Sequence, residues 1–171
     1  SGVTTSAKQG GPAVFVLSGQ VRLNNVNLLD NTAVGRGGAV RCNSKTAVVF
    51  MNGCLLKGNS RNGSWGNGIQ MSEGHICINN TTLIDNMGTG AALNGSILLT
   101  NNTIIGNTSD SHGAVRCETG VGGDTKFINN LLLSENPSAP SFNLNGSNFE
   151  AFSKGYNVYQ RVTGITMSAS D

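Results

Sequence analysis

Charge is scarce in this sequence, and no stretch of it is basic. Lys, Arg, Asp and Glu make up 12% of the 171 residues, and the formal net charge is +2. The eleven Lys and Arg residues are dispersed along the chain, whereas nucleic-acid-binding domains gather theirs into patches or runs. The sequence therefore predicts no nucleic-acid partner.

Long apolar runs and a leader sequence are also missing. No stretch of 18 apolar residues occurs, which is the length a transmembrane helix needs, so we expect no membrane span in this segment. The chain has no initiator Met and no charged-then-apolar leader. We therefore expect a processed, truncated or engineered segment of a longer chain.

Helical periodicity is the third absence. The chain contains 24 Gly and 23 Asn, which are poor helix formers. No window carries apolar residues at i, i+3, i+4 and i+7 for three turns, which argues against a helical solenoid. Hairpin signals at two-residue loops are lacking as well, which argues against a conventional β-sandwich.

What the sequence does contain is a repeat. Residues 38–42 (Gly-Ala-Val-Arg-Cys) return unchanged at 113–117, and successive copies begin fewer than 30 residues apart. A unit of this size that recurs along a chain is typical of a stacked repeat. Weaker copies occupy residues 12–16, 67–71, 90–94 and 140–144.

A second signal follows each copy, in which a pair of asparagines precedes a short aliphatic run and a further asparagine. It occupies residues 24–31, 79–86, 101–107 and 129–136, with a degraded form at 52–59. One strand type recurring once per unit in one orientation predicts parallel stacking, for which right-handed winding is the rule. Asparagines at the corners would stack at the strand spacing of about 4.8 Å and share amide hydrogen bonds. We predict an all-β fold, a right-handed single-stranded parallel β-helix (solenoid) of about six coils with stacked Asn corners.

Strand side chains alternate between faces, so the repeated strand can be divided into columns. Two columns are almost wholly apolar and are predicted to face inward, with Asn94 the one exception: Val14, Val40, Ile69, Ala92, Val115, Phe142, and Val16, Cys42, Met71, Asn94, Cys117, Leu144. The column between them is mostly polar and is predicted to face outward: Phe15, Arg41, Gln70, Leu93, Arg116, Asn143. A slip of one residue would exchange the faces, so the register is well determined.

Residues 101–115 resemble the repeat of right-handed β-helix surface proteins with pectate-lyase-like architecture, and residues 154–159 and 166–171 resemble the closing segment of the choice-of-anchor Q type. This resemblance implies a bacterial protein that is secreted or attached to the cell envelope. We expect one β-helix domain over residues 1–171, with a lead-in loop at 1–12, coils at 13–159 and a tail at 160–171. Because uncapped solenoid ends are exposed edges, we expect either more chain at one or both ends or tails folded over the ends, and we favour further coils on the N-terminal side. The protein would be a monomer or would associate end to end.

The four cysteines do not have the spacing of a metal site, and no CxxC or Cys/His pattern suggests zinc. Cys42 and Cys117 share an inward column three coils apart, roughly 14 Å at the strand spacing, which is too far for a disulfide. We predict that both are buried free thiols.

The outward column and its flanking loops hold the candidate ligand-binding residues. Arg and Gln side chains along one face, beside a Trp in a glycine-rich loop, suit an extended acidic polysaccharide, because forked donors bind carboxylate or sulfate and the ring offers a stacking surface. The alternative is that these are ordinary solvated side chains. The candidates are Arg41, Trp65, Gln70, His112 and Arg116.

Carboxylates do not cluster. Asp30, Asp85 and Glu135 are predicted to share one turn position but to skip coils, so that neighbours lie roughly 10 Å apart, at the loose end for a glycosidase pair. Asp110, His112 and Arg116 form the only local acid–base trio. We therefore assign no catalytic residue, metal site or cofactor, and favour a non-enzymatic secreted or cell-surface module that recognises an extended acidic polysaccharide. A polysaccharide lyase or glycoside hydrolase acting on uronate-containing glycans is the alternative, and Ca²⁺ would accompany the lyase.

Overall fold

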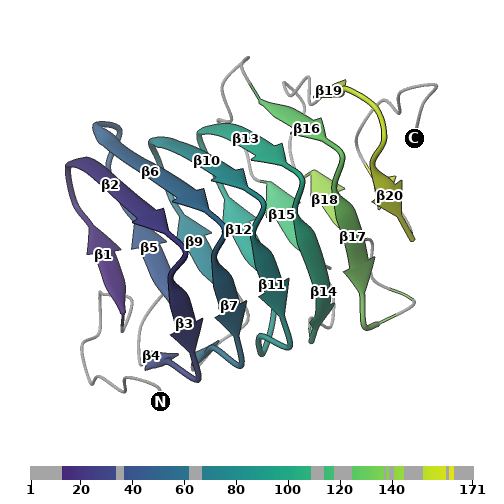
Figure 1. Ribbon diagram of the computed structural model, residues 1–171, viewed down its shortest axis with the longest axis horizontal. Helices are drawn as coiled ribbons and strands as arrows, with labels where there is room; N and C mark the ends of the chain where they lie inside the picture. The colour runs from purple at the N-terminus through teal and green to yellow at the C-terminus, as the bar shows by residue number, and fades with distance from the viewer. Residues whose placement is uncertain are drawn as a thin grey trace.

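The computed structural model describes residues 13–33, 37–61, 67–108, 114–117, 125–136, 138, 141–144, 152–160 and 162–163. Every regular element in these residues is a β-strand, and the strands form three long parallel sheets plus one short pair. The sheets run side by side along one axis from the N-terminal to the C-terminal end (Figure 1). The predicted all-β parallel solenoid is confirmed.

Each long sheet takes one strand from each coil. The first sheet contains β1 (Val14–Val16), β5 (Val40–Cys42), β9 (Ile69–Met71), β12 (Ala91–Leu93), β15 (Val115–Cys117), β18 (Phe142–Leu144) and β21 (Val162–Thr163). The second contains β2 (Gly19–Asn24), β6 (Ala47–Asn52), β10 (His75–Asn79), β13 (Ser96–Thr100), β16 (Lys126–Ile128) and β19 (Phe152–Ser153). The third contains β3 (Asn27–Leu29), β7 (Leu55–Lys57), β11 (Thr82–Ile84), β14 (Thr103–Asn107), β17 (Leu131–Ser134) and β20 (Val158–Tyr159). The short pair joins β4 (Thr32–Ala33) to β8 (Ser60–Arg61).

Successive coils therefore pair strand for strand. The coils β5–β7, β9–β11, β12–β14 and β15–β17 each lie between two neighbouring coils, and β1–β3 and β18–β20 flank them. In Figure 1 the first-sheet strands run upward behind the second and third sheets, whose strands run downward in front, while the chain advances to the right. This path is a right-handed winding, as predicted.

A ladder of buried amides runs along the corner after the third sheet. The first ladder consists of Asn31, Asn59, Asn86 and Asn107, all 3% exposed or less. Each Nδ2 donates to Oδ1 of the next member, at 2.8, 2.8 and 2.9 Å. Each backbone N–H donates to the same oxygen at 3.0 to 3.1 Å. One side chain per coil thus satisfies backbone groups that the corner takes out of the sheets.

The corner between the second and third sheets holds a second ladder, whose first members are not asparagines. Asn102, Asn130 and Asn157 are linked by Nδ2-to-Oδ1 bonds of 3.0 and 2.9 Å. Upstream, Thr81 Oγ1 accepts the backbone N–H of Cys54 at 3.3 Å. The Cys54 thiol donates to Leu23 O at 3.3 Å, as Asn102 Nδ2 donates to Ile78 O. The second ladder therefore comprises Cys54, Thr81, Asn102, Asn130 and Asn157.

The residue before each ladder position turns the chain in the left-handed region. In front of the first ladder these residues are Asp30, Gly58, Asp85 and Gly106, with φ between 53° and 65°. Among residues with a side chain, Asn and Asp enter this region most readily, and Gly enters it without steric cost. Gly58 is also required by its neighbour, because a Cβ there would meet Asp30 Oδ1 in the preceding coil.

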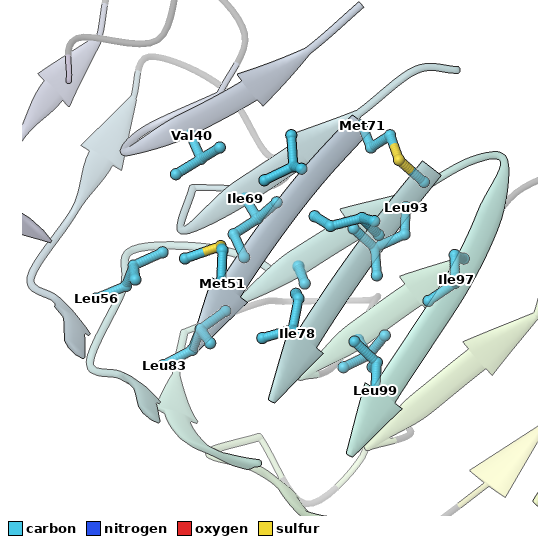
Figure 2. Packing of buried hydrophobic residues seen from close by; sticks show 14 of the residues in the cluster. Val40, Met51, Leu56, Ile69, Met71, Ile78, Leu83, Leu93, Ile97 and Leu99 are labelled. Atoms are coloured by element: carbon cyan, nitrogen blue, oxygen red, sulfur yellow. The ribbon is translucent and has the colours of Figure 1, made fainter. Parts of the chain in front are cut away.

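The space between the three sheets is filled by aliphatic side chains that alternate with outward ones. Figure 2 shows Val40 and Ile69 from the first sheet facing Met51 and Ile78 from the second and Leu83 from the third. All five are 2% exposed or less. Each such side chain contributes about 1.5–3 kcal/mol relative to an exposed position, which fixes the register in every coil.

The register confirms the predicted columns in all coils but one. Ala91, not Ala92, pairs with Ile69 and Val115, and Leu93 pairs with Met71 and Cys117. The alignment that placed Asn94 in the core was wrong by one residue. Leu93 fills the core position at 0% exposure, so both inward columns are apolar over the coils whose side chains the structure describes.

The cysteine prediction is confirmed. Cys42 and Cys117 are buried free thiols three strands apart in the first sheet. Cys54 is also buried and free, and Cys77 is free and half-buried.

Candidate functional site

The outward face of the first sheet carries a single row of candidate side chains, which we call the arginine row. Phe15 pairs with Arg41, Arg41 with Gln70, Gln70 with Ala92, and Ala92 with Arg116. Parallel in-register pairing places these residues above one another at about 4.8 Å per strand, so Arg41 and Arg116 are about 14 Å apart along the axis. The prediction that both arginines and Gln70 share one face is confirmed.

The described contacts of the row involve Arg41 and Gln70. The Arg41 guanidinium carbon lies 5.2 Å from the centroid of the Phe15 ring, within reach of a cation–π attraction. Gln70 Nε2 donates to Ser72 Oγ at 3.0 Å. Gln70 Oε1 is buried and has no hydrogen-bond partner in the described part of the molecule, which leaves one acceptor in the row for an external donor or an ordered water.

The exposure of the row differs from the expectation. Arg41, Gln70 and Arg116 are each 6% exposed and Ala92 is 4% exposed, so the prediction of open outward side chains was right about the face and wrong about the accessibility. Alternation along a strand decides which side of the sheet a residue faces, but it does not decide whether other parts of the molecule cover that side. Arg41 and Arg116 each have interactions within the molecule, as charges at this depth require.

Two of the five candidates cannot be placed. Trp65 and His112 lie outside the described residues. The structure therefore brings Arg41, Gln70 and Arg116 together and leaves the aromatic and imidazole parts of the predicted site as predictions. Phe15 was missed as a partner of Arg41 in the sequence analysis, although Phe15 is the aligned residue of the preceding copy.

A second cation–aromatic pair lies on the outward face of the second sheet. The Arg22 guanidinium carbon lies 4.2 Å from the centroid of the Phe50 ring, and Arg22 pairs with Phe50 across adjacent strands. Arg22 is exposed, unlike Arg41 and Arg116. It is therefore a cation of the same kind on a different face.

The described carboxylates are placed at corners rather than in a cleft. Asp30 and Asp85 both occupy left-handed positions before the first ladder, in coils separated by Gly58. Glu135 does not share their position, because Ser134 pairs with Asn107 after a register shift and Glu135 follows it. Asp85 lies 3.9 Å from Lys57 across an exposed ion pair. Within the described ranges, no three His, Cys, Asp or Glu side chains gather closely enough to hold a metal ion.

Burial affects the acidity of two of the thiols. Burial raises the pKa of Cys42, with a smaller lowering by a hydrogen bond from the backbone of Ser44. Burial also raises the pKa of Cys77. Because the thiolate is the nucleophile, a raised pKa lowers reactivity at neutral pH.

No protein-family model matches this chain, and no curated protein and no solved structure matches it. In the part of the chain that the structure describes, no helix is long and apolar enough to cross a membrane.

Proposed function

We propose that this chain is a non-enzymatic β-solenoid module of a secreted or cell-surface protein and that it recognises an extended acidic polysaccharide along the arginine row. The observation that carries the proposal is the alignment of Arg41, Gln70 and Arg116 in one row parallel to the solenoid axis. A polymer with repeated carboxylates or sulfates can meet both guanidinium groups at once only if they lie along its own direction. The resemblance of residues 101–115, 154–159 and 166–171 to β-helix surface proteins implies an envelope or extracellular location.

The chemistry of the row favours a ligand that carries both an anion and hydroxyl groups. Guanidinium groups bind planar carboxylates through two parallel hydrogen bonds. The acceptor at Gln70 Oε1 would take a hydroxyl hydrogen. Uronate-containing glycans offer both groups on one sugar.

The burial of the row has a consequence for this proposal. Arg41, Gln70 and Arg116 are each 6% exposed, so binding of a polymer to this row requires that more of these side chains become accessible. The free energy of that exposure would lower the apparent affinity.

The test is binding to a panel of polymers, with calcium and with a chelator. The panel contains polygalacturonate, its methyl ester and a neutral glucan. We expect polygalacturonate alone to bind, and the variant Arg41→Gln/Arg116→Gln to lose most of that binding. Arg22→Gln is the matched control, because it removes one exposed positive charge from another face and should leave binding nearly unchanged.

The same experiment distinguishes the enzymatic alternative. Unsaturated uronates absorb in the ultraviolet, so a rise in absorbance that the double variant abolishes would identify a lyase and overturn a non-enzymatic module. Equal binding of all three polymers, or an equal loss in the control variant, would show that the arginine row is not the recognition surface. Thermal unfolding of each variant shows whether a loss of binding is caused by a loss of folding.

A further inference from the structure

An asparagine that precedes a glycine is prone to spontaneous deamidation, because glycine has no side chain to hinder the reaction. The glycine backbone nitrogen attacks the asparagine Cγ and forms a bond to it. The bond from Cγ to Nδ2 breaks, and Nδ2 leaves as ammonia with the glycine N–H proton. Water then opens the cyclic imide to aspartate or isoaspartate. The described residues contain three such pairs: Asn52-Gly53, Asn67-Gly68 and Asn94-Gly95.

Neighbouring coils hold two of these pairs in place. The backbone N–H of Gly53 donates to Asn79 O at 3.2 Å, and Asn52 Oδ1 accepts from Asn79 Nδ2 at 2.7 Å. The attack on Asn52 would therefore have to break two hydrogen bonds. Asn67 is 1% exposed, so the water that opens the imide is excluded. The next coil also packs on this amide, because a Cβ on Gly88 would meet Asn67 Nδ2.

The third pair is held by neither means. Asn94 is half-buried and lies with Gly95 between β12 and β13. In the part of the chain that the structure describes, neither the Asn94 side chain nor the Gly95 N–H makes a hydrogen bond. Gly95 has φ 131°, and a Cβ there would meet Gly74 O in the preceding coil. The fold therefore requires glycine after Asn94, and the reactive pair is retained.

We propose that Asn94 is a site of spontaneous deamidation in the folded protein, and that the product places a carboxylate beside the arginine row. The backbone N–H groups of Ser72 and Asn94 donate to Cys42 O and Met71 O. Ser72 and Asn94 thus continue the pairing of the first sheet by one residue and share one column. Ser72 Oγ accepts from Gln70 Nε2, so this column lies on the same side of the sheet as the row.

The new carboxylate would act on both halves of the row. Asn94 follows Ala92 by two residues, which places it about 7 Å along the strand. Ala92 is one strand from Gln70 and one strand from Arg116. A negative charge at this position would attract the guanidinium groups and repel an anionic polymer. This consequence rests on the proposed function, whereas the modification itself does not.

Peptide mapping by mass spectrometry tests the modification, after the intact chain has been incubated at mildly alkaline pH with and without denaturant. In the native protein Asn94 should react about tenfold faster than Asn52, because breaking two hydrogen bonds costs at least that factor. In denaturant the three described pairs should react at similar rates. Native deamidation of Asn94 that is no faster than that of Asn52 or Asn67 overturns the proposal. Asn94→Gln is the blocking variant and should stay unmodified.

Binding to polygalacturonate tests the consequence for the row. Asn94→Asp reproduces the aspartate product and should lower the affinity about threefold, the effect of one unit charge at about 7 Å in water. Asn52→Asp is the matched control, because it adds the same charge at an exposed position at the end of β6 and should leave binding nearly unchanged. Equal binding by the parent and both variants overturns the consequence. If the parent does not bind, the proposed function and this consequence both fail, and the peptide map still decides on the modification.

Discussion

Replacing a single amide in the first ladder should destabilise the whole solenoid. Asn86 is fully buried, and its side chain takes part in four hydrogen bonds. Oδ1 accepts from the backbone and side-chain nitrogens of Asn59 at 3.0 and 2.8 Å. Nδ2 donates to Leu56 O at 3.1 Å and to Asn107 Oδ1 at 2.9 Å.

The magnitude follows from the groups that Asn86→Ala leaves without a partner. The Asn59 backbone N–H and one Asn59 side-chain hydrogen would lose their acceptor in a site closed to water. Each unsatisfied buried group costs about 1–3 kcal/mol, so the expected loss is about 2–6 kcal/mol. That is a large share of the about 5–15 kcal/mol that holds a typical domain folded.

Urea unfolding followed by circular dichroism measures the loss, provided that the slope with denaturant is unchanged. Asn52→Ala is the matched control, because Asn52 is exposed and accepts one bond, from Asn79 Nδ2 at 2.7 Å. The control should cost about 0.5 kcal/mol or less. If Asn86→Ala and Asn52→Ala destabilise equally, the first ladder does not stabilise the fold as argued.

The variant Asn86→Asp adds a pH test. Burial raises a carboxyl pKa, so this variant should be most stable when the carboxyl is protonated. Its stability should fall as pH rises through that pKa.

Two further predictions concern a corner and the thiols. Gly58→Ala should lower the free energy of unfolding by about 1–3 kcal/mol, because Ala would be strained at φ 65° and its Cβ would meet Asp30 Oδ1. Gly19→Ala, at φ 75° with open space around the Cβ, should cost less, and an equal cost in thermal or urea unfolding would contradict the steric argument. For the thiols, a thiol reagent should modify at most the half-buried Cys77 in the native protein and all four cysteines in denaturant. Because burial raises the pKa of Cys42 and Cys77 above 9.0, their neutral form is favoured by folding, so stability should fall as pH rises past 9, and rapid native labelling of all four would contradict the burial.

The repeat was readable because the core accepts so few residue types at inward positions. Val40, Cys42 and their equivalents recur with the spacing of one coil, and the structure confirms the sheet they form. The fourth copy was misaligned because Gly90, Ala91 and Ala92 are all small, so that only Leu93 distinguishes the two registers by size. Leu is favoured over Asn at an inward position, so placing Leu93 instead of Asn94 in the inward column would have given the correct register.

The candidate site was harder to predict than the fold for a physical reason. Side-chain alternation follows from the backbone alone, but it does not determine how deeply Arg41, Gln70 and Arg116 are buried. The same limit applies to the second ladder, where Cys54 and Thr81 act as hydrogen-bonding members although neither residue resembles asparagine. Their role follows from their position in the column of Asn102 and from side chains that can donate or accept a hydrogen bond.

The amide ladders also give the solenoid an electrical direction. Along both buried ladders the Oδ1 atoms accept from the preceding member and so face the N-terminal end. The amide dipoles therefore share one direction and add as peptide dipoles do in a helix. On the surface, Asn79, Asn101 and Asn129 donate the opposite way, where solvent screens them. The buried sum leaves the N-terminal end of the rod relatively negative and the C-terminal end relatively positive. The two ends of the solenoid therefore differ in electrostatic potential, so that a charged group is stabilised differently at each end.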